Sequence, residues 1–266
     1  MRVLDYHVHS EYSEDSTAPM REIVQSAIKK NISEFVFTDH IELYITELSV
    51  IEQSLKKQYS EYLDLKEEFS DKISLKFGME VSQPLYTLSE TDYICSMLPY
   101  DFIIFSIHKA KVGSDYYFMD YANVNIKDEC DKYIEELGEI VDTLTNYSVL
   151  GHVDYLARYI KKHNVDFNFN SLTERFRPIF KTLIQKGKGI ELNVSGLRTN
   201  HGATMPSEQI LKVYKECGGE IITIGSDAHQ PECLGERFFD GIEILKRNGF
   251  DKIAVFDKMN VEFINI

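Results

Sequence analysis

The sequence lacks any hydrophobic run that could cross a membrane and any loop motif that cradles a nucleotide. No stretch of its 266 residues approaches the ~20 consecutive apolar residues of a transmembrane helix. Neither Gly-x-Gly-x-x-Gly nor Gly-x-x-x-x-Gly-Lys occurs, which excludes the usual phosphate-binding loops. Linkers rich in Pro, Gly or Ser, low-complexity tracts and internal repeats are also missing. We therefore expect one domain over residues 1–266.

Cysteine and basic residues are both scarce. The four cysteines form no Cys-x-x-Cys pair, which is typical of free thiols in a reducing compartment. The N-terminal residues lack the apolar segment and cleavage site of a signal peptide, so we expect a cytoplasmic protein. Lys and Arg number 29 against 43 Asp and Glu, a net charge of −14. This deficit of cations argues against nucleic-acid partners, and we expect neither nucleic acid nor membrane as a partner. The oligomeric state stays open.

Short apolar runs alternate with helical stretches along the chain. The expected strands, rich in Val, Ile and Phe, are Val3–His9, Glu34–Thr38, Leu75–Val81, Asp101–His108, Ser148–Asp154, Gly189–Val194 and Ile221–Ser226. The expected helices are Pro19–Lys30, Thr46–Phe69, Lys127–Asn146, Leu172–Lys186, Pro206–Cys217 and Leu234–Asn248, before a final run, Lys252–Phe256. Alternation of this kind, without a domain break, predicts an α/β fold with a parallel sheet.

Histidines and carboxylates recur where these strands end. His7 and His9 stand two apart, so in a strand they share one face. Metal-ligand residue types follow later runs, namely His40, Glu80, His108, His152, Asp227 and His229. A single His after a strand is more often an ordinary polar loop residue, but six of the eight histidines lie at strand ends. Ligands after nearly every strand favour a barrel over an open sheet, so we expect a distorted (β/α)7 TIM-like barrel.

Several segments resemble the polymerase and histidinol phosphatase (PHP) superfamily of metal-dependent phosphoesterases. In chain order they are Asp5–His9, Asp15, Thr38–His40, Gly78–Glu80, Ser106–His108, Gly151–Asp154 and Gly225–His229. The resemblance covers residues 1 to about 235. Within the superfamily the chain is most similar to the histidinol-phosphate phosphatases of histidine biosynthesis, because Ile190–Arg198 resembles their E-x-N-x-S-G-x-R segment.

The resemblance implies two or three divalent ions, which would be Zn, Mn or Fe. One ion would be held by His7, His9, Glu80 and Asp227. A second would share Glu80 and add His108 and His152, and a third would take Asp15, His40 and His229. Many relatives have His where this chain has Asp15, and a carboxylate there favours Fe or Mn over Zn. The candidates for orienting the nucleophile or moving a proton are Asp227, His229 and His40.

The implied reaction is the hydrolysis of L-histidinol phosphate to L-histidinol and phosphate. Arg198 and Arg158 follow late strands, and the fork of a guanidinium matches phosphate oxygens, although either residue could instead be an ordinary surface arginine. Carboxylates that could meet the substrate amine are Glu42, Asp115 and Glu191, each of which could equally face solvent. A related PHP phosphoesterase that acts on another phosphate monoester or on nucleotides remains the alternative.

Overall fold

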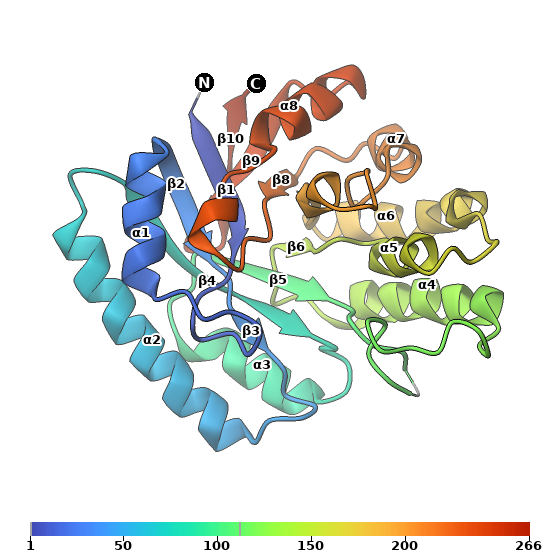
Figure 1. Ribbon diagram of the computed structural model, residues 1–266, viewed down its shortest axis with the longest axis horizontal. Coiled ribbons are helices and arrows are strands. Elements are labelled where there is room, and N and C mark those ends of the chain that lie inside the picture. The colour runs from blue at the N-terminus through green and yellow to red at the C-terminus, as the bar shows by residue number, and fades with distance from the viewer. Residues whose placement is uncertain (1, 112) are drawn as a thin grey trace.

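A computed structural model, which describes residues 2–111 and 113–266, shows a parallel sheet that bends almost into a barrel (Figure 1). Its strands are β1 (Val3–Val8), β2 (Ile32–Phe37), β4 (Ser74–Ser82), β5 (Phe102–Ser106), β6 (Val149–Leu150), β7 (Gly189–Asn193) and β8 (Ile222–Gly225). They are hydrogen-bonded in the order β1-β2-β4-β5-β6-β7-β8, and the short β3 (His40–Ile41) pairs with β4. All seven expected strands are therefore confirmed.

The two ends of this sheet, β1 and β8, meet at their carboxyl ends. The amide of His9 donates a hydrogen bond of 2.9 Å to the carbonyl of Ala228, and the amide of Asp227 donates one of 2.9 Å to the carbonyl of His7. Below these bonds the Asp5 carboxylate accepts from the amide of Ser226 at 2.8 Å, so a side chain spans the junction. The result is a nearly closed barrel of seven parallel strands, which confirms the expected distorted (β/α)7 fold.

Helices surround the sheet, with α1 to α3 on the left of Figure 1 and α4 to α7 on the right. They are α1 (Met20–Lys29), α2 (Leu48–Glu68), α3 (Leu88–Met97), α4 (Ile126–Thr143), α5 (Tyr155–Lys162), α6 (Phe176–Gln185), α7 (Glu208–Glu216) and α8 (Phe238–Arg247). Short 3-10 helices are η1 (Phe169–Arg175), η2 (Ser195–Arg198) and η3 (Pro231–Cys233). All six expected helices are present, although the expected Leu172–Lys186 begins as η1. None of the helices in the described part of the chain is long and apolar enough to span a membrane.

A hairpin of β9 (Lys252–Asp257) and β10 (Asn260–Asn265) covers the amino-terminal end of the barrel. The ring of Phe256 packs 5.1 Å from that of Phe102 at the start of β5, and its amide donates to the Tyr6 hydroxyl at 2.9 Å. The expected final run is thus a strand, but it lies outside the barrel sheet. With one end covered by this hairpin, the opposite end, where the strands finish, is the one that carries the ligand residues.

Candidate metal centre

Glu80 lies at the middle of a cluster of imidazoles at the carboxyl end of the barrel. Its Oε1 is 3.2 Å from Nε2 of His108 and 3.0 Å from Nε2 of His152. Its Oε2 is 3.2 Å from Nε2 of His7 and 2.9 Å from Nδ1 of His40. The Glu80 side chain has no exposed surface. His9 also lies near Oε2, at 3.7 Å, so this one carboxylate joins ligands that come from or directly follow β1, β3, β5 and β6.

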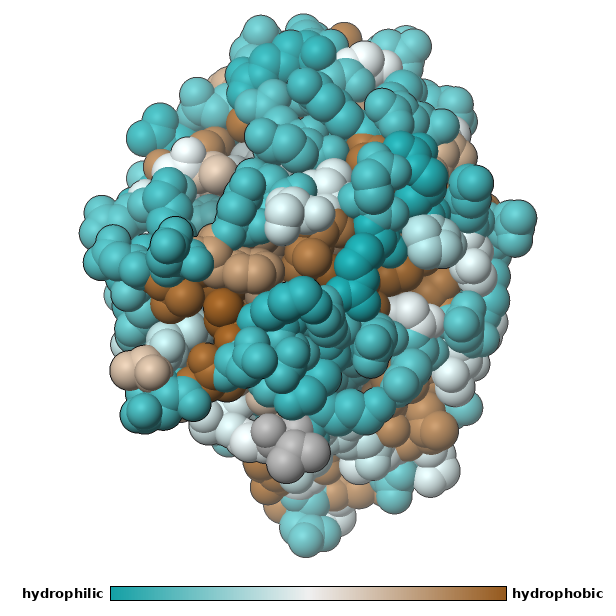
Figure 2. Space-filling model, turned by 90° about the vertical axis from the view of Figure 1, so that its right-hand side faces the viewer, coloured by the Kyte–Doolittle hydropathy of each residue, from teal (hydrophilic) through white to brown (hydrophobic). Residues whose placement is uncertain are grey.

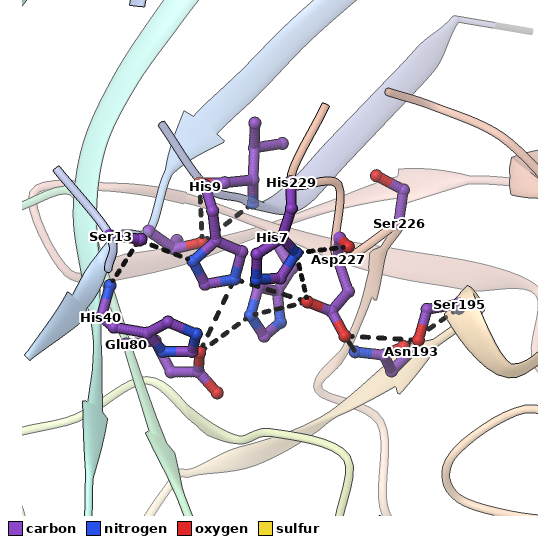
Figure 3. Close-up of polar contacts among 12 residues, drawn as sticks. His7, His9, Ser13, His40, Glu80, Asn193, Ser195, Ser226, Asp227 and His229 are labelled. Atoms are coloured by element: carbon purple, nitrogen blue, oxygen red, sulfur yellow. Dashed lines mark hydrogen bonds and ion pairs between the residues drawn. The ribbon is translucent and has the colours of Figure 1, made fainter. Parts of the chain in front are cut away.

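Asp227 and Asp15 complete the cluster on the side of β8. Oδ1 of Asp227 lies 3.4 Å from Nε2 of His9 and 3.6 Å from Nδ1 of His229. Oδ2 of Asp15 lies 2.9 Å from Nε2 of His229 and 3.6 Å from Nε2 of His40. Figure 3 shows His9, His229 and Asp227 side by side above Glu80. The structure therefore brings all nine residues that were expected to bind metal into one centre.

The donor atoms of this centre fit divalent cations. Nε2 of His9, Nδ1 of His40 and Nε2 of His229 are buried without a hydrogen-bond partner, although each lies within 4 Å of a carboxylate oxygen. Four overlapping groups of three ligands lie close enough to hold an ion: His9, His40 and His229; His7, Glu80 and His152; His7, His9 and Asp227; and His40, Glu80 and His108. Imidazole nitrogens with carboxylate oxygens suit Zn, Mn and Fe.

Hydrogen bonds from behind the cluster fix the orientation of its rings. Oε1 of Glu191 lies 2.7 Å from Nδ1 of His7, and Oγ of Ser13 lies 3.1 Å from Nδ1 of His9. Oγ of Ser82 lies 2.9 Å from Nδ1 of His108. In each ring the other nitrogen faces the centre, as expected where a supporting group sets the tautomer of a metal-ligating histidine.

The chain bends sharply where it leaves β8, and this bend aims Asp227 at the centre. Asp227 has a φ of +54°, in the left-handed region that a residue other than glycine occupies only under constraint. Its Oδ2 accepts hydrogen bonds of 3.3 Å from Nδ2 of Asn193 and from Oγ of Ser195. Gly225 precedes the bend, and a Cβ there would lie 2.2 Å from Oε1 of Glu191 and 2.4 Å from Cβ of His7. Only glycine leaves room for that pair.

The charges of the centre set one another's protonation. Burial lowers the pKa of His7, but the carboxylates of Glu191 and Glu80 outweigh burial and raise this pKa well above its usual value. Burial together with the neighbouring rings of His229 and His40 lowers the pKa of His9. Burial raises the pKa of Glu80, but the surrounding imidazoles, His7 foremost, hold it well below its usual value. Glu80 is therefore an anion throughout the neutral range, as a ligand to a cation must be.

A cavity of about 930 Å³ opens above the centre. Both arginines expected at the phosphate line this cavity, and so do two of the three expected carboxylates, Glu42 and Asp115. The Arg198 guanidinium lies at the end of β8, where its Nη1 donates a hydrogen bond of 2.7 Å to the carbonyl of Ser226. Burial raises the pKa of Glu42.

Glu191 is the exception among the expected substrate contacts. It is fully buried, does not line the cavity, and has one oxygen on His7 and the other accepting from the amide of His152 at 3.0 Å. The expectation that it meets the substrate amine is wrong, because both carboxylate oxygens already contact His7 and the amide of His152, away from the cavity.

The supporting residues Ser13, Ser82 and Asn193 did not emerge from the sequence as functional. The sequence spacing could have indicated two of them, since Ser82 stands two residues after Glu80 and Asn193 stands two residues after Glu191. Residues two apart in a strand share a face, so this spacing places both toward the centre. Ser13 lies in the loop after β1, where no such periodicity applies.

A nearly closed parallel barrel with six histidines and three carboxylates at its strand ends defines a metal-dependent hydrolase. A sequence profile of the PHP domain matches residues 5–195, and the chain belongs to this family. The resemblance expected from the sequence is therefore confirmed.

The chain is also similar over its full length to named relatives. It is 29% identical to the histidinol-phosphatase of Lactococcus lactis over 98% of this chain and 97% of that one. It is 27% identical to the probable histidinol-phosphatase of Thermotoga maritima over 96% and 97%. The crystal structure of the histidinol phosphate phosphatase from L. lactis, complexed with zinc, L-histidinol and phosphate, matches with a TM-score of 0.81 and 28% identity, covering 98% and 99%. The putative histidinol phosphatase from Listeria monocytogenes has the same fold, with a TM-score of 0.75, 18% identity and coverage of 89% and 99%.

Proposed function

We propose that this protein is a histidinol-phosphatase, which hydrolyses L-histidinol phosphate to L-histidinol and phosphate in histidine biosynthesis. The observation that carries the proposal is a metal-ligand centre that borders a cavity lined by two arginines, Arg158 and Arg198, and by the carboxylates of Glu42 and Asp115. The L. lactis enzyme, whose crystal structure holds zinc, L-histidinol and phosphate, supports the choice of substrate because the two chains match almost end to end. One barrel domain over residues 1–266 carries the whole reaction.

The nine ligands are assigned to three ions. The first takes His7, His9, Glu80 and Asp227; the second takes Glu80, His108 and His152; the third takes Asp15, His40 and His229. Glu80 supports its shared role because Oε1 faces His108 and His152 of the second set, whereas Oε2 lies near His7 and His9 of the first. The Asp15 carboxylate adds a hard oxygen to the third set, which suits Mn or Fe as well as Zn.

The protein's part in the chemistry is to hold charges and a dianionic ester in fixed positions. When bound, divalent cations offset the charge of the phosphate and make a water molecule acidic enough to attack phosphorus at neutral pH. Glu191, Ser13 and Ser82 keep the ligand rings aligned. Arg198 and Arg158 bind the phosphate oxygens from the cavity wall, where a guanidinium can bind two of them at once.

Proton transfer is assigned to groups at the edge of the centre. The side chains of His229 and His40 are 27% and 15% exposed, whereas that of His7 is fully buried. Nδ1 of His229 lies 3.1 Å from the backbone carbonyl of Asp227 and 3.6 Å from its Oδ1, so the ring is held beside the Asp227 carboxylate. Asp227 orients the attacking water, and His229 or His40 passes a proton to the leaving alkoxide on the solvent side.

We assign substrate selection to the opposite charges that line the cavity. Arg198 and Arg158 would hold the phosphate over the metal centre, and Glu42 and Asp115 would pair with the cationic amine of histidinol. Oδ1 of Asp115 accepts from the amide of Tyr117 at 2.6 Å, which holds this carboxylate in place. Nucleotides carry no such cation and would leave both carboxylates without a partner.

The test is phosphate release by metal-loaded protein from L-histidinol phosphate, nucleotide monophosphates and aryl phosphates. We expect kcat/KM for L-histidinol phosphate to be at least about a hundredfold higher, the scale of one or two well-placed polar contacts. The Glu80→Gln protein, purified in parallel, controls for a contaminating phosphatase. Equal efficiency with a nucleotide would instead identify a PHP phosphoesterase of another specificity.

Elemental analysis of protein purified without chelator tests the ion assignment. We expect two or three divalent ions per chain. Glu80→Gln should lower occupancy at two sites together, because the bridging carboxylate loses an anionic oxygen. Glu42→Gln, a matched change on the cavity wall, should leave the count unchanged. Loss of one ion with activity intact would contradict the bridging role.

A further inference from the structure

A smaller cavity of about 260 Å³ adjoins the main one on the side of α5. Its lining consists of Tyr117, Arg158, Tyr159, Lys162, Thr199, Asn200 and His201. Four of these residues also line the main cavity, namely Tyr117, Arg158, Tyr159 and Thr199, so the two spaces share a wall. Figure 2 turns the α4 to α7 side of the barrel toward the viewer and shows a mostly hydrophilic surface there. We call the smaller space the side cavity.

The side cavity concentrates positive charge in an acidic protein. The helix α5 carries three cations, Arg158, Lys161 and Lys162. Within residues 2–111 and 113–266, no carboxylate oxygen lies within 4 Å of any of their charged groups. Nζ of Lys162 sits 4.1 Å from the ring centroid of Tyr117, which holds the ammonium at the cavity wall. In a chain of net charge −14, Arg158 and Lys162 beside one cavity favour an anion there.

His201 supplies an independent sign of a ligand. It is only 9% exposed, and neither of its ring nitrogens has a hydrogen-bond partner. Its ring packs on Gly196, where an added Cβ would lie 2.7 Å from Cδ2 of the imidazole. Burial, with Lys161 and Arg158 nearby, lowers the pKa of His201 to about 4. At neutral pH the ring therefore offers one N–H donor and one acceptor nitrogen to whatever fills the cavity.

We propose that the side cavity is a second anion site, which binds hydrogen phosphate next to the metal centre. Lys162 would pair with its oxygens, and His201 would donate a hydrogen bond from one ring N–H to an oxygen. The claim that this phosphate is the reaction product rests on the proposed function. The claim that the side cavity binds phosphate does not. The site gives the product a position away from the metals, from which it leaves while the next substrate enters.

Equilibrium dialysis of zinc-loaded protein against radiolabelled inorganic phosphate counts the sites. We expect two phosphates per chain in the natural protein and one in His201→Phe, whose ring fills the space without hydrogen-bonding groups. Lys162→Met, which leaves the buried ring untouched, should weaken the second site at least about tenfold. Lys181→Met on α6 is the matched control, since Lys181 is exposed and should keep both sites. One phosphate in the natural protein, or two in His201→Phe, would overturn the proposal.

A kinetic measurement sharpens the result. Product inhibition by phosphate should be mixed in the natural protein and purely competitive in His201→Phe, with turnover in the absence of added phosphate unchanged. A protein that binds two phosphates but does not cleave histidinol phosphate would refute the proposed function and leave the side cavity as assigned.

Discussion

Glu191 lies directly against His7, with its Oε1 atom 2.7 Å from Nδ1 of the imidazole and both side chains closed off from solvent. Its second oxygen accepts a hydrogen bond from the amide of His152 at 3.0 Å. One carboxylate on β7 thus orients a ligand on β1 and the backbone of another ligand after β6. The metal centre consequently depends on residues that no substrate touches.

Replacing Glu191 by Gln tests this dependence. The amide keeps the size of the side chain but removes the negative charge that raises the pKa of His7. We expect metal affinity or kcat to fall by roughly ten- to a hundredfold, the usual effect of losing a partner behind a metal ligand. Titration of the metal-free protein with zinc and steady-state kinetics measure the two quantities. Unchanged values of both would show that Glu191 is only a packing residue.

Gly225→Ala should damage stability and activity together. The new Cβ would meet Oε1 of Glu191 at 2.2 Å and Cβ of His7 at 2.4 Å, neither of which can move freely. We expect the free energy of unfolding to fall by about 1–3 kcal/mol, as in other overpacked cores. Gly138→Ala on α4 is the control, because its Cβ would have 3.8 Å to Ile179 and alanine favours the helix. Urea unfolding should separate the two variants, with Gly138→Ala no less stable than the natural protein.

Arg198→Ala should separate phosphate recognition from metal binding. The guanidinium donates to the carbonyl of Ser226 and lies at the cavity wall rather than among the metal ligands. We expect kcat/KM to fall roughly ten- to a hundredfold, the loss of a charged hydrogen bond, while metal content stays the same. Arg237→Ala, which removes an exposed arginine that pairs with Asp240, should change neither quantity. Kinetics identical to those of the natural protein would place Arg198 outside the reaction.

Glu136 on α4 should make stability depend on pH. It is buried, and burial raises its pKa from 4.5 to about 7. In that range the folded state holds more protons than the unfolded state, so this residue lowers stability progressively as the pH rises from about 4.5 to about 7. Glu136→Gln keeps a carbonyl oxygen that can accept the hydrogen bond from Nε2 of Gln83, now 3.1 Å from Oε1 of Glu136, but the amide cannot ionise.

The stability of Glu136→Gln relative to the natural protein should therefore increase across this pH range. The slope of the difference should be at most about 1.4 kcal/mol per pH unit. Chemical denaturation of both metal-loaded proteins at a series of pH values gives the difference and cancels the common contribution of the metals. Glu139→Gln, an exposed change on the same helix, should track the natural protein more closely. A difference that stays flat with pH would show that Glu136 remains ionised in the fold.

The barrel and its ligands could be predicted because two regular features coincide. Parallel strands end at one edge, so His9, Glu80 and His152 had to lie near one another once their apolar runs were identified as parallel strands. The helices α3 and α5 and the strand β10 were not expected. α3 buries only Thr91 and Ile94 and so lacks a clear helical period, and every residue of β10 is exposed.

The role of Glu191 could not be read from the chain because it depends on the register between distant strands. Its side chain alternates with that of Leu192, which predicts a face but not what lies across the barrel. Only the pairing of β7 with β8, and the junction of β8 with β1, places His7 against it. Asp227 likewise reaches the centre through its left-handed backbone conformation, which the neighbouring residues in the sequence do not predict.

The junction of β1 with β8 has a consequence for biosynthesis of the chain. It joins His7 and His9 to Asp227 and Ala228, residues from nearly opposite ends of the sequence. A ribosome must therefore deliver almost the whole polypeptide before the ligand set is complete, and until then the first strand has an open edge. An ion that took ligands from both sides would tie the first strand to the last and offset the entropy of closing so long a loop. Under the proposed assignment, metal supply during translation would therefore affect how many chains reach the native state.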